Sequence, residues 1–93
     1  MPVATPAMVI SGIPFRVLSV SGRTPTGLVD FVDAKAFTID MDGSPYSVAG
    51  DGRVDDDKVR FHEKDVNNGK DVRVWTLCCL EDGSFCAEQA TAF

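Results

Sequence analysis

The chain has 93 residues, of which 44% are hydrophobic and 25% are charged, and its formal net charge is −5. A chain of this size folds around one small core, which leaves little room for a deep catalytic cleft. Its negative charge argues against a nucleic-acid partner, because phosphate binding depends on clustered Lys and Arg. No apolar run is long enough to cross a bilayer. The start of the chain does not resemble a secretory signal, so we expect a cytoplasmic protein without a membrane partner.

The N-terminal part of the chain predicts a flexible arm over residues 1–7, which contain two prolines, and a single β domain over residues 8–93. A first strand is expected over residues 8–20, where apolar and polar side chains alternate. A second strand is expected over residues 27–32, and a third over residues 36–41.

Turn signals recur along the whole chain, each beside a run rich in Val, Ile, Phe or Thr. Helical periodicity never persists for the ten residues that a packed helix needs. We therefore predict an all-β fold, a small antiparallel β-barrel or sandwich of five to seven short strands. The turn signals are Ser21-Gly22, Asp42-Gly43, Gly50-Asp51-Gly52, Asn68-Gly69 and Asp82-Gly83.

The Asp42-Gly43 turn predicts a two-residue hairpin, which fixes the pairing of the flanking strands. Ile39 then faces Tyr46, and Phe37 faces Val48. One face of this hairpin is apolar and the other is polar, so the pattern agrees with the turn.

A two-residue turn at Asn68-Gly69 would place His62 opposite Trp75 and Arg60 opposite Leu77. The strand over residues 72–80 is then apolar on both faces, which is typical of a central strand. Trp and Arg are frequent in binding hot spots. The candidate partner-binding residues are Trp75, Arg60, His62, Arg73 and Leu77. In a closed barrel this face is exposed, whereas in a sandwich Trp75 belongs to the core, and the sequence leaves both arrangements open.

The three cysteines are an odd number, which does not predict a disulfide framework and suits a reducing compartment. A two-residue turn at Asp82-Gly83 would oppose Cys79 and Cys86, so we expect mild oxidation to join these two and to leave Cys78 free. Together with His62 the cysteines make a poor zinc site, because adjacent cysteines in a strand point to opposite faces.

The stretch over residues 50–55 is similar to the middle of an EF-hand loop, but the full pattern fails. With Gly52 at the invariant glycine, position twelve is Lys58 instead of a bidentate glutamate. Four aspartates in this region could hold a cation weakly, although a charged loop that discourages edge pairing explains them better. They are Asp51, Asp55, Asp56 and Asp57. We expect neither a metal nor a cofactor.

For function, we expect a non-enzymatic module that binds another protein or assembles with itself through an exposed sheet face or strand edge. Small acidic domains of this kind occur among viral accessory and structural components, which is an analogy from size and composition. The alternative is a small-ligand-binding barrel in which Phe15, Phe31, Phe37 and Tyr46 line a pocket. An enzyme with a Cys or carboxylate site comes third. A buried pocket with convergent polar groups favours the ligand alternative, whereas a flat apolar patch favours the partner.

Overall fold

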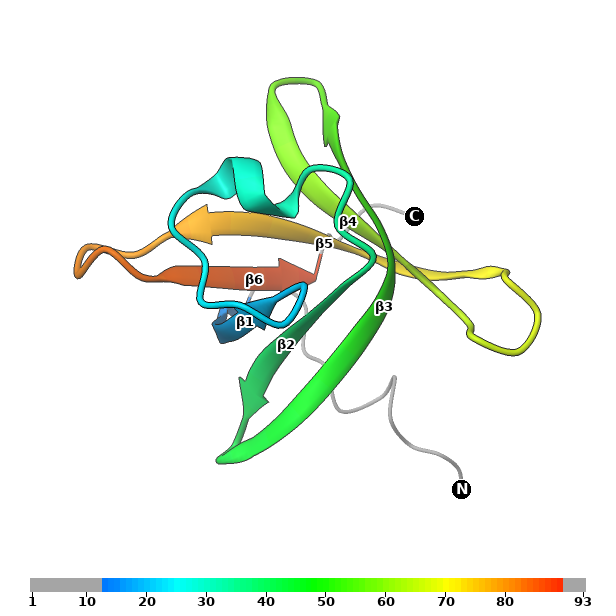
Figure 1. Cartoon of the computed structure of the whole chain (residues 1–93), viewed down its shortest axis with the longest axis horizontal. Helices are drawn as coiled ribbons and strands as arrows, with labels where there is room; N and C mark the ends of the chain where they lie inside the picture. The colour runs from blue at the N-terminus through cyan, green and yellow to red at the C-terminus, as the bar shows by residue number, and fades with distance from the viewer. Residues whose placement is uncertain (1–12, 90–93) are drawn as a thin grey trace.

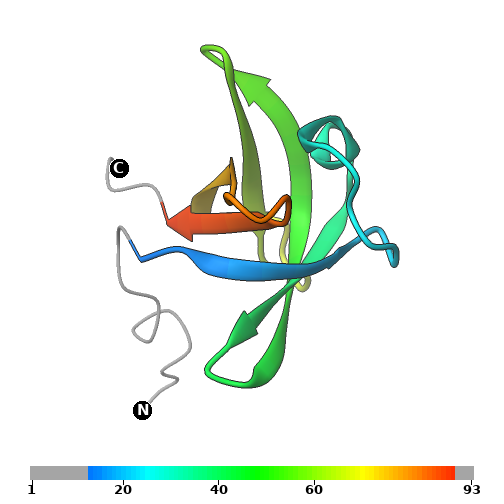
Figure 2. The same ribbon diagram turned by 90° about the vertical axis from the view of Figure 1, so that its left-hand side faces the viewer.

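The computed structural model describes residues 13–89, in which six antiparallel strands close into a barrel (Figure 1, Figure 2). The predicted all-β fold is confirmed, in its barrel form. The predicted 1–7 arm and residues 8–12 of the predicted first strand lie outside the described residues. The elements are β1 (Phe15–Val20), η1 (Leu28–Phe31), β2 (Ala36–Met41), β3 (Ser44–Asp55), β4 (Lys58–Lys64), β5 (Asp71–Cys79) and β6 (Phe85–Gln89).

The core fills the inside of the barrel with the inward side chains of the strands and with Phe31 of η1. Alternation produces this core, because every second residue of a strand points to the same face. Aromatic rings meet edge to face inside it, including Phe37 with Phe61 at 4.8 Å between centroids. The buried apolar residues of the cluster are Val17, Val20, Phe31, Ala34, Phe37, Ile39, Val48, Phe61, Trp75, Leu77, Phe85 and Ala87.

The β2–β3 hairpin has the predicted register, with Ile39 opposite Tyr46 and Phe37 opposite Val48. Its two turn residues both have left-handed backbone angles, with φ of 54° at Asp42 and 86° at Gly43. Such turns follow the natural twist of the strands, which is why an Asp-Gly pair predicts them well.

The β4–β5 connection is longer than the two residues predicted, and the register differs by one. The Asp65 amide donates to the Lys70 carbonyl at 2.8 Å, so four residues form the loop between them. The Asp65 carboxylate also accepts a hydrogen bond from the amide of Asn67 at 2.7 Å. Trp75 consequently lies opposite Phe61, and the predicted pairing of His62 with Trp75 is wrong. A slip of one residue moves every side chain of a strand to the other face.

The β5–β6 turn has three residues, and it overturns the predicted cysteine pair. The Leu80 amide donates to the Ser84 carbonyl at 2.8 Å, and Cys78 is the residue opposite Cys86. A disulfide joins Cys78 and Cys86, whose Cα atoms are 5.0 Å apart, while Cys79 is exposed and free. Disulfides persist mainly in oxidising compartments, so this bond disagrees with the reducing compartment that the odd number of cysteines suggested. The compartment itself stays a prediction.

The predicted strand over residues 27–32 is also wrong, because η1 occupies this segment. The Asp30 carboxylate accepts hydrogen bonds from the backbone amides of Thr26 at 2.7 Å and Gly27 at 3.3 Å. A short acidic side chain that bonds its own backbone in this way competes with strand pairing. The turn that results carries Phe31 into the core.

The stretch that is similar to an EF-hand loop is part of β3, and its glycine has a packing role. The Gly52 amide donates to the Ala34 carbonyl at 2.9 Å, and the Gly52 carbonyl accepts from the Asp33 amide at 2.8 Å. A Cβ atom on Gly52 would lie 1.6 Å from the Phe31 carbonyl oxygen. Only glycine allows the segment after η1 to approach β3 this closely.

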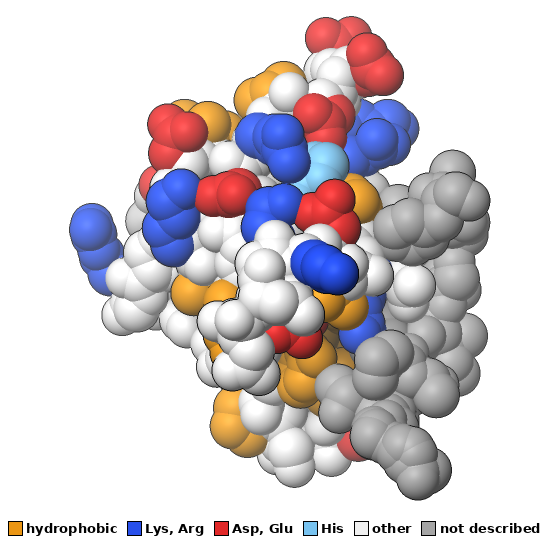
Figure 3. Space-filling model, turned by 90° about the vertical axis from the view of Figure 1, so that its right-hand side faces the viewer, with side chains coloured by type: hydrophobic (Ala, Val, Ile, Leu, Met, Phe, Trp, Pro, Cys, Tyr) orange, Lys and Arg blue, Asp and Glu red, His pale blue; other side chains and the backbone are white. Residues whose placement is uncertain are grey.

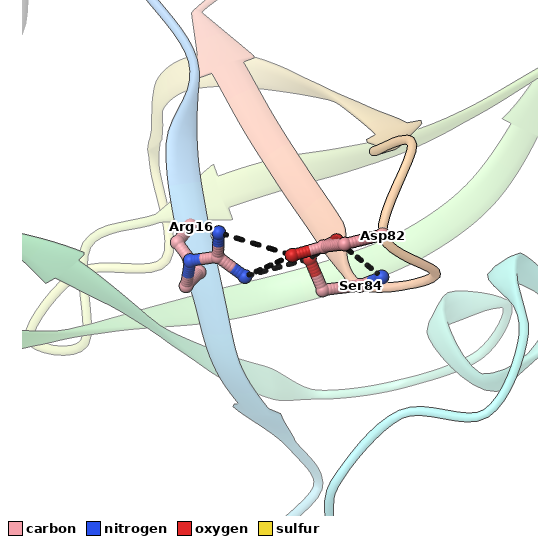
Figure 4. A network of polar contacts seen from close by, with 3 residues as sticks. All are labelled: Arg16, Asp82 and Ser84. Atoms are coloured by element: carbon pink, nitrogen blue, oxygen red, sulfur yellow. Dashed lines mark hydrogen bonds and ion pairs between the residues drawn. The ribbon is translucent and has the colours of Figure 1, made fainter.

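The barrel closes between β1 and β6 through the register pairs Phe15 with Ala87 and Arg16 with Cys86. The Arg16 guanidinium reaches across this closure to the β5–β6 turn (Figure 4). It donates to the Ser84 hydroxyl at 2.6 Å and lies 3.4 Å from an Asp82 carboxylate oxygen. This polar contact fastens the turn to β1 where the strand pairing is short.

Candidate functional site

The five residues predicted to bind a partner do not share a face. Trp75 is completely buried, Leu77 is 5% exposed and Arg73 is 4% exposed, and all three point into the barrel. Arg60 and His62 lie on the outer face of β4, opposite Thr76 and Val74. The expectation that a closed barrel would expose Trp75 is therefore wrong, because the one-residue shift in register pairs Trp75 with Phe61 inside the barrel.

A buried polar network surrounds the Trp75 indole. The Trp75 Nε1–H donates to the Glu63 carboxylate at 2.9 Å. The Arg73 Nε lies 3.2 Å from the same Glu63 oxygen, and the Arg73 guanidinium carbon lies 5.9 Å from the centre of the Trp75 ring. A buried ion pair is costly to desolvate unless its groups are well bonded, so this pair is an unusual feature of a small core.

The sequence builds this network through strand alternation. Glu63 follows Phe61 by two residues on β4, and Arg73 precedes Trp75 by two residues on β5, so all four side chains point inward. Glu63 and Arg73 are register partners. The length of the β4–β5 loop therefore decides that the carboxylate and the guanidinium meet.

A pocket of about 350 Å³ opens beside this network, where β4 ends and β5 begins, and we call it the barrel-end pocket. In Figure 1 this loop and η1 lie on opposite sides of the molecule. The volume is within the range of small-molecule sites. The lining residues are Ala36, Tyr46, Ser47, Val48, Ala49, Glu63, Lys64, Asp65, Val66, Val72 and Arg73.

The charges that line the barrel-end pocket cancel. Glu63 and Asp65 are acidic, and Lys64 and Arg73 are basic. Lys64 also forms an ion pair with Asp71 outside the pocket. The Arg73 Nη1 atom is buried and has no hydrogen-bond partner among the described residues. A buried donor without an acceptor costs about 1–3 kcal/mol of stability, so an acceptor that bonded this nitrogen would stabilise the protein.

The Tyr46 phenol completes the polar part of the barrel-end pocket. Burial raises the pKa of Tyr46, and the negative charge of Glu63 acts in the same direction. The phenol therefore stays protonated and neutral at physiological pH.

Of the four aromatic residues predicted to line a ligand pocket, one lines the barrel-end pocket. Tyr46 lines the barrel-end pocket, whereas Phe31 and Phe37 are core residues and Phe15 packs against Trp75. Glu63 was missed. Its position two residues after Phe61 was the available signal, because alternation alone puts it on the buried face.

A second hollow of about 240 Å³ lies beside the loop before η1, next to Arg23, Thr26 and Asp30. The Asp30 carboxylate beside this hollow already accepts hydrogen bonds from the two backbone amides that shape the loop and from the Thr26 hydroxyl. Hydrogen bonds from Thr26 lower the pKa of Asp30. This hollow therefore has a structural explanation, unlike the barrel-end pocket.

The outer face of β3 and β4 carries a band of charged side chains around the one histidine (Figure 3). The His62 Nε2 lies 2.6 Å from an Asp55 carboxylate oxygen, and this hydrogen bond lowers the pKa of Asp55. Asp51 pairs with Lys35 at 2.7 Å. Within residues 13–89 no group of three His, Cys, Asp or Glu side chains is placed to hold a metal ion.

Comparisons with protein-family models, curated proteins and solved structures gave no match to this chain. In the part of the chain that the structure describes, no helix has the length and apolar character needed to span a membrane.

Proposed function

We propose that this protein is a non-enzymatic binding module whose site is the barrel-end pocket. The ligand is a small, uncharged, largely apolar compound with a hydrogen-bond acceptor such as an amide oxygen. This proposal takes up the ligand-binding alternative of the sequence analysis. The partner-binding face expected around Trp75 loses its basis, because Trp75 is inside the core.

The observation that carries the proposal is a pocket of suitable size lined by Arg73, whose buried Nη1 has no hydrogen-bond partner among the described residues. A small shift of the Arg73 side chain toward the pocket would bring Nη1 within reach of a ligand oxygen, and the hydrogen bond would remove the cost of the buried donor. The Arg73 Nε already forms an ion pair with the Glu63 carboxylate. Nη1 is therefore the Arg73 donor left for a ligand, and a few such polar groups give ligand sites their specificity.

Charge balance decides between ligand classes. The guanidinium of Arg73 is neutralised by Glu63 at 3.2 Å, and the pocket lining carries no net charge. A carboxylate ligand would meet the Glu63 carboxylate in a site of low dielectric, where repulsion is strong. A cation would meet Arg73. An uncharged acceptor avoids both penalties.

The rim supports an apolar body on the ligand. Val66 is 82% exposed and Val72 is 38% exposed, and both line the barrel-end pocket. The remaining large exposed apolar side chains of the described chain are spread over other segments, at Ile13, Leu18, Val29 and Val54. Apolar contact at this rim adds affinity in proportion to the area removed from water.

The test is a nuclear magnetic resonance titration with three matched probes: benzamide, benzoate and benzamidine. Trp75 is the only tryptophan, so one indole N–H signal reports on the pocket floor. We expect benzamide to shift this signal and the amides of Val66 and Val72, with a Kd on the order of 1 mM. Benzoate and benzamidine should bind at least about tenfold more weakly.

A pocket-filling variant supplies the control. Ala36→Leu adds bulk to the pocket wall and should abolish the benzamide shifts. Ser44→Leu, at an exposed position of the same hairpin outside the pocket, should leave them unchanged. Equal binding of the three probes, or benzamide shifts that survive Ala36→Leu, would refute the proposal.

A further inference from the structure

The outer face of the β3–β4 hairpin opposes two arginines. Arg53 and Arg60 are register partners at neighbouring positions of the two strands. Like charges directly opposite each other destabilise a strand pair by several tenths of a kcal/mol. Neither guanidinium forms an ion pair within residues 13–89, and the Arg60 Nε is buried without a partner.

The nearby carboxylates on this face are already engaged. Asp55 contacts His62, and Asp51 contacts Lys35. The positive charge of Arg53 and Arg60 helps to lower the pKa of Asp55, and that of Arg53 helps to lower the pKa of Asp51, but neither guanidinium forms an ion pair with these carboxylates. A guanidinium has five N–H donors, so an acidic group from outside the molecule could still form ion pairs with both arginines.

The tip of the same hairpin has the complementary charge. Asp56 and Asp57 form its two-residue turn, both are exposed, and neither makes an ion pair among the described residues. Both have left-handed backbone angles, with φ of 49° and 70°. Asn-Gly is the preferred pair for such a turn, so the aspartates are not there for their turn geometry alone.

Along the hairpin, charge thus runs from two carboxylates at the tip, through the balanced register pair of Asp55 and Lys58, to the Arg53 and Arg60 pair. A second hairpin laid against it in the opposite direction would put each tip over the other's arginines. We infer that the β3–β4 hairpin is a self-complementary surface that pairs two copies of this chain about a two-fold axis.

Local charge complementarity has to act against overall repulsion, since each copy carries a net charge of −5. At about 0.1 M salt the Debye length is about 10 Å, so long-range repulsion is screened more than ion pairs in contact. We therefore expect a weak, reversible dimer with a Kd near or below about 1 mM at this salt concentration.

Charge exchange followed by sedimentation velocity tests the inference. Arg53→Glu with Arg60→Glu makes the arginine position acidic like the tip, and Asp56→Lys with Asp57→Lys makes the tip basic like the arginine pair. Each double variant should be monomeric alone, because like charges then meet in both contacts of the dimer. An equimolar mixture should form a heterodimer, because one contact keeps the wild-type pairing of aspartates with arginines and the other restores it with the signs exchanged.

The Asp56→Asn, Asp57→Gly double variant separates this contact from nonspecific association and from misfolding. It relaxes the turn, and it lowers the net charge to −3, which would strengthen nonspecific association. We expect it to weaken the dimer at least about fivefold, since each tip contact is lost.

A monomeric wild-type protein at millimolar concentration, or no heterodimer in the mixture, overturns the inference. Binding of a hexaglutamate peptide to a monomeric wild type would assign the arginines to a foreign acidic partner instead. The barrel-end pocket is outside this hairpin surface, so the result of the ligand titration does not depend on whether the chain forms a dimer.

Discussion

Glu63 and Arg73 face each other across β4 and β5 inside the barrel, with the Arg73 Nε 3.2 Å from a Glu63 carboxylate oxygen. The same oxygen accepts the Trp75 indole hydrogen. This pair forms the floor of the barrel-end pocket and ties the site to the stability of the core.

Removing one partner of this pair should be costly. Glu63→Ala leaves the Arg73 guanidinium buried without its carboxylate, so we expect the free energy of unfolding to fall by about 3–5 kcal/mol. Lys64→Ala, which removes a more exposed pair with Asp71, should cost less than about 1 kcal/mol. Urea denaturation at neutral pH measures both. Equal losses of unfolding free energy would mean that Glu63 is solvated and that it does not form a buried pair with Arg73 at the pocket floor.

The double variant Glu63→Met, Arg73→Met gives a second view of the pair. Because apolar side chains of similar volume remove both charges together, its loss should be far smaller than the summed losses of the single variants Glu63→Met and Arg73→Met. The same variant should lose benzamide binding, since the donor at the pocket floor is gone. An additive loss of stability would show that the two side chains do not interact.

The disulfide should stabilise the last hairpin. Cys78 and Cys86 are eight residues apart, and closing so short a loop is worth about 2.5 kcal/mol. Cys86→Ser should remove this stabilisation, whereas Cys79→Ser should have little effect because Cys79 is exposed and free. Peptide mapping under non-reducing conditions checks the bond directly. Recovery of a disulfide-linked Cys79–Cys86 peptide would mean that the β5–β6 turn has two residues, in contradiction with the three-residue turn of the structure.

Gly52 should tolerate no side chain. A Cβ atom there would lie 1.6 Å from the Phe31 carbonyl oxygen, so Gly52→Ala must displace η1 or β3 and should cost about 1–3 kcal/mol or more. Gly27→Ala is the matched control, because its Cβ meets only a Val29 methyl at 3.9 Å. Thermal unfolding followed by circular dichroism compares the two. A Gly52→Ala protein as stable as Gly27→Ala would mean that η1 does not pack against β3.

Acid should weaken the loop before η1. Hydrogen bonds from Thr26 hold the pKa of Asp30 below its ordinary value of 3.8. A lowered pKa in the folded state contributes stability above the unfolded value, and that stability is lost as pH falls through the folded value. Asp30→Asn should therefore be less stable than wild type at pH 6, with the difference shrinking below pH 3.8. A stability difference that does not change with pH would mean that the ionised Asp30 carboxylate does not stabilise this loop.

Much of the fold was predictable because local chemistry determines it. The Asp42-Gly43 pair adopts the left-handed angles of a two-residue hairpin, and the alternation around it agrees with that register. The Asn68-Gly69 pair has the same appearance in sequence, but the Asp65 carboxylate bonds the following amides and builds a longer loop. Loop length is set here by a side-chain contact that turn propensity does not include.

That one loop also explains the failure at the candidate site. A one-residue change in register exchanges the two faces of β5, which moves Trp75 and Arg73 from the surface to the interior. The residues that build the barrel-end pocket come from β2, β3, β4, β5 and the β4–β5 loop, so their meeting depends on how these consecutive strands curve around the barrel. Sequence patterns give the face of each strand and do not give this convergence.

The most direct measurement is a crystal structure of the protein grown with benzamide. The pocket proposal predicts the amide oxygen within about 2.7–3.2 Å of the Arg73 Nη1, with the ring against Val66 and Val72. An empty barrel-end pocket under saturating benzamide, or a Nη1 atom bonded to an acceptor of the protein itself, would contradict it.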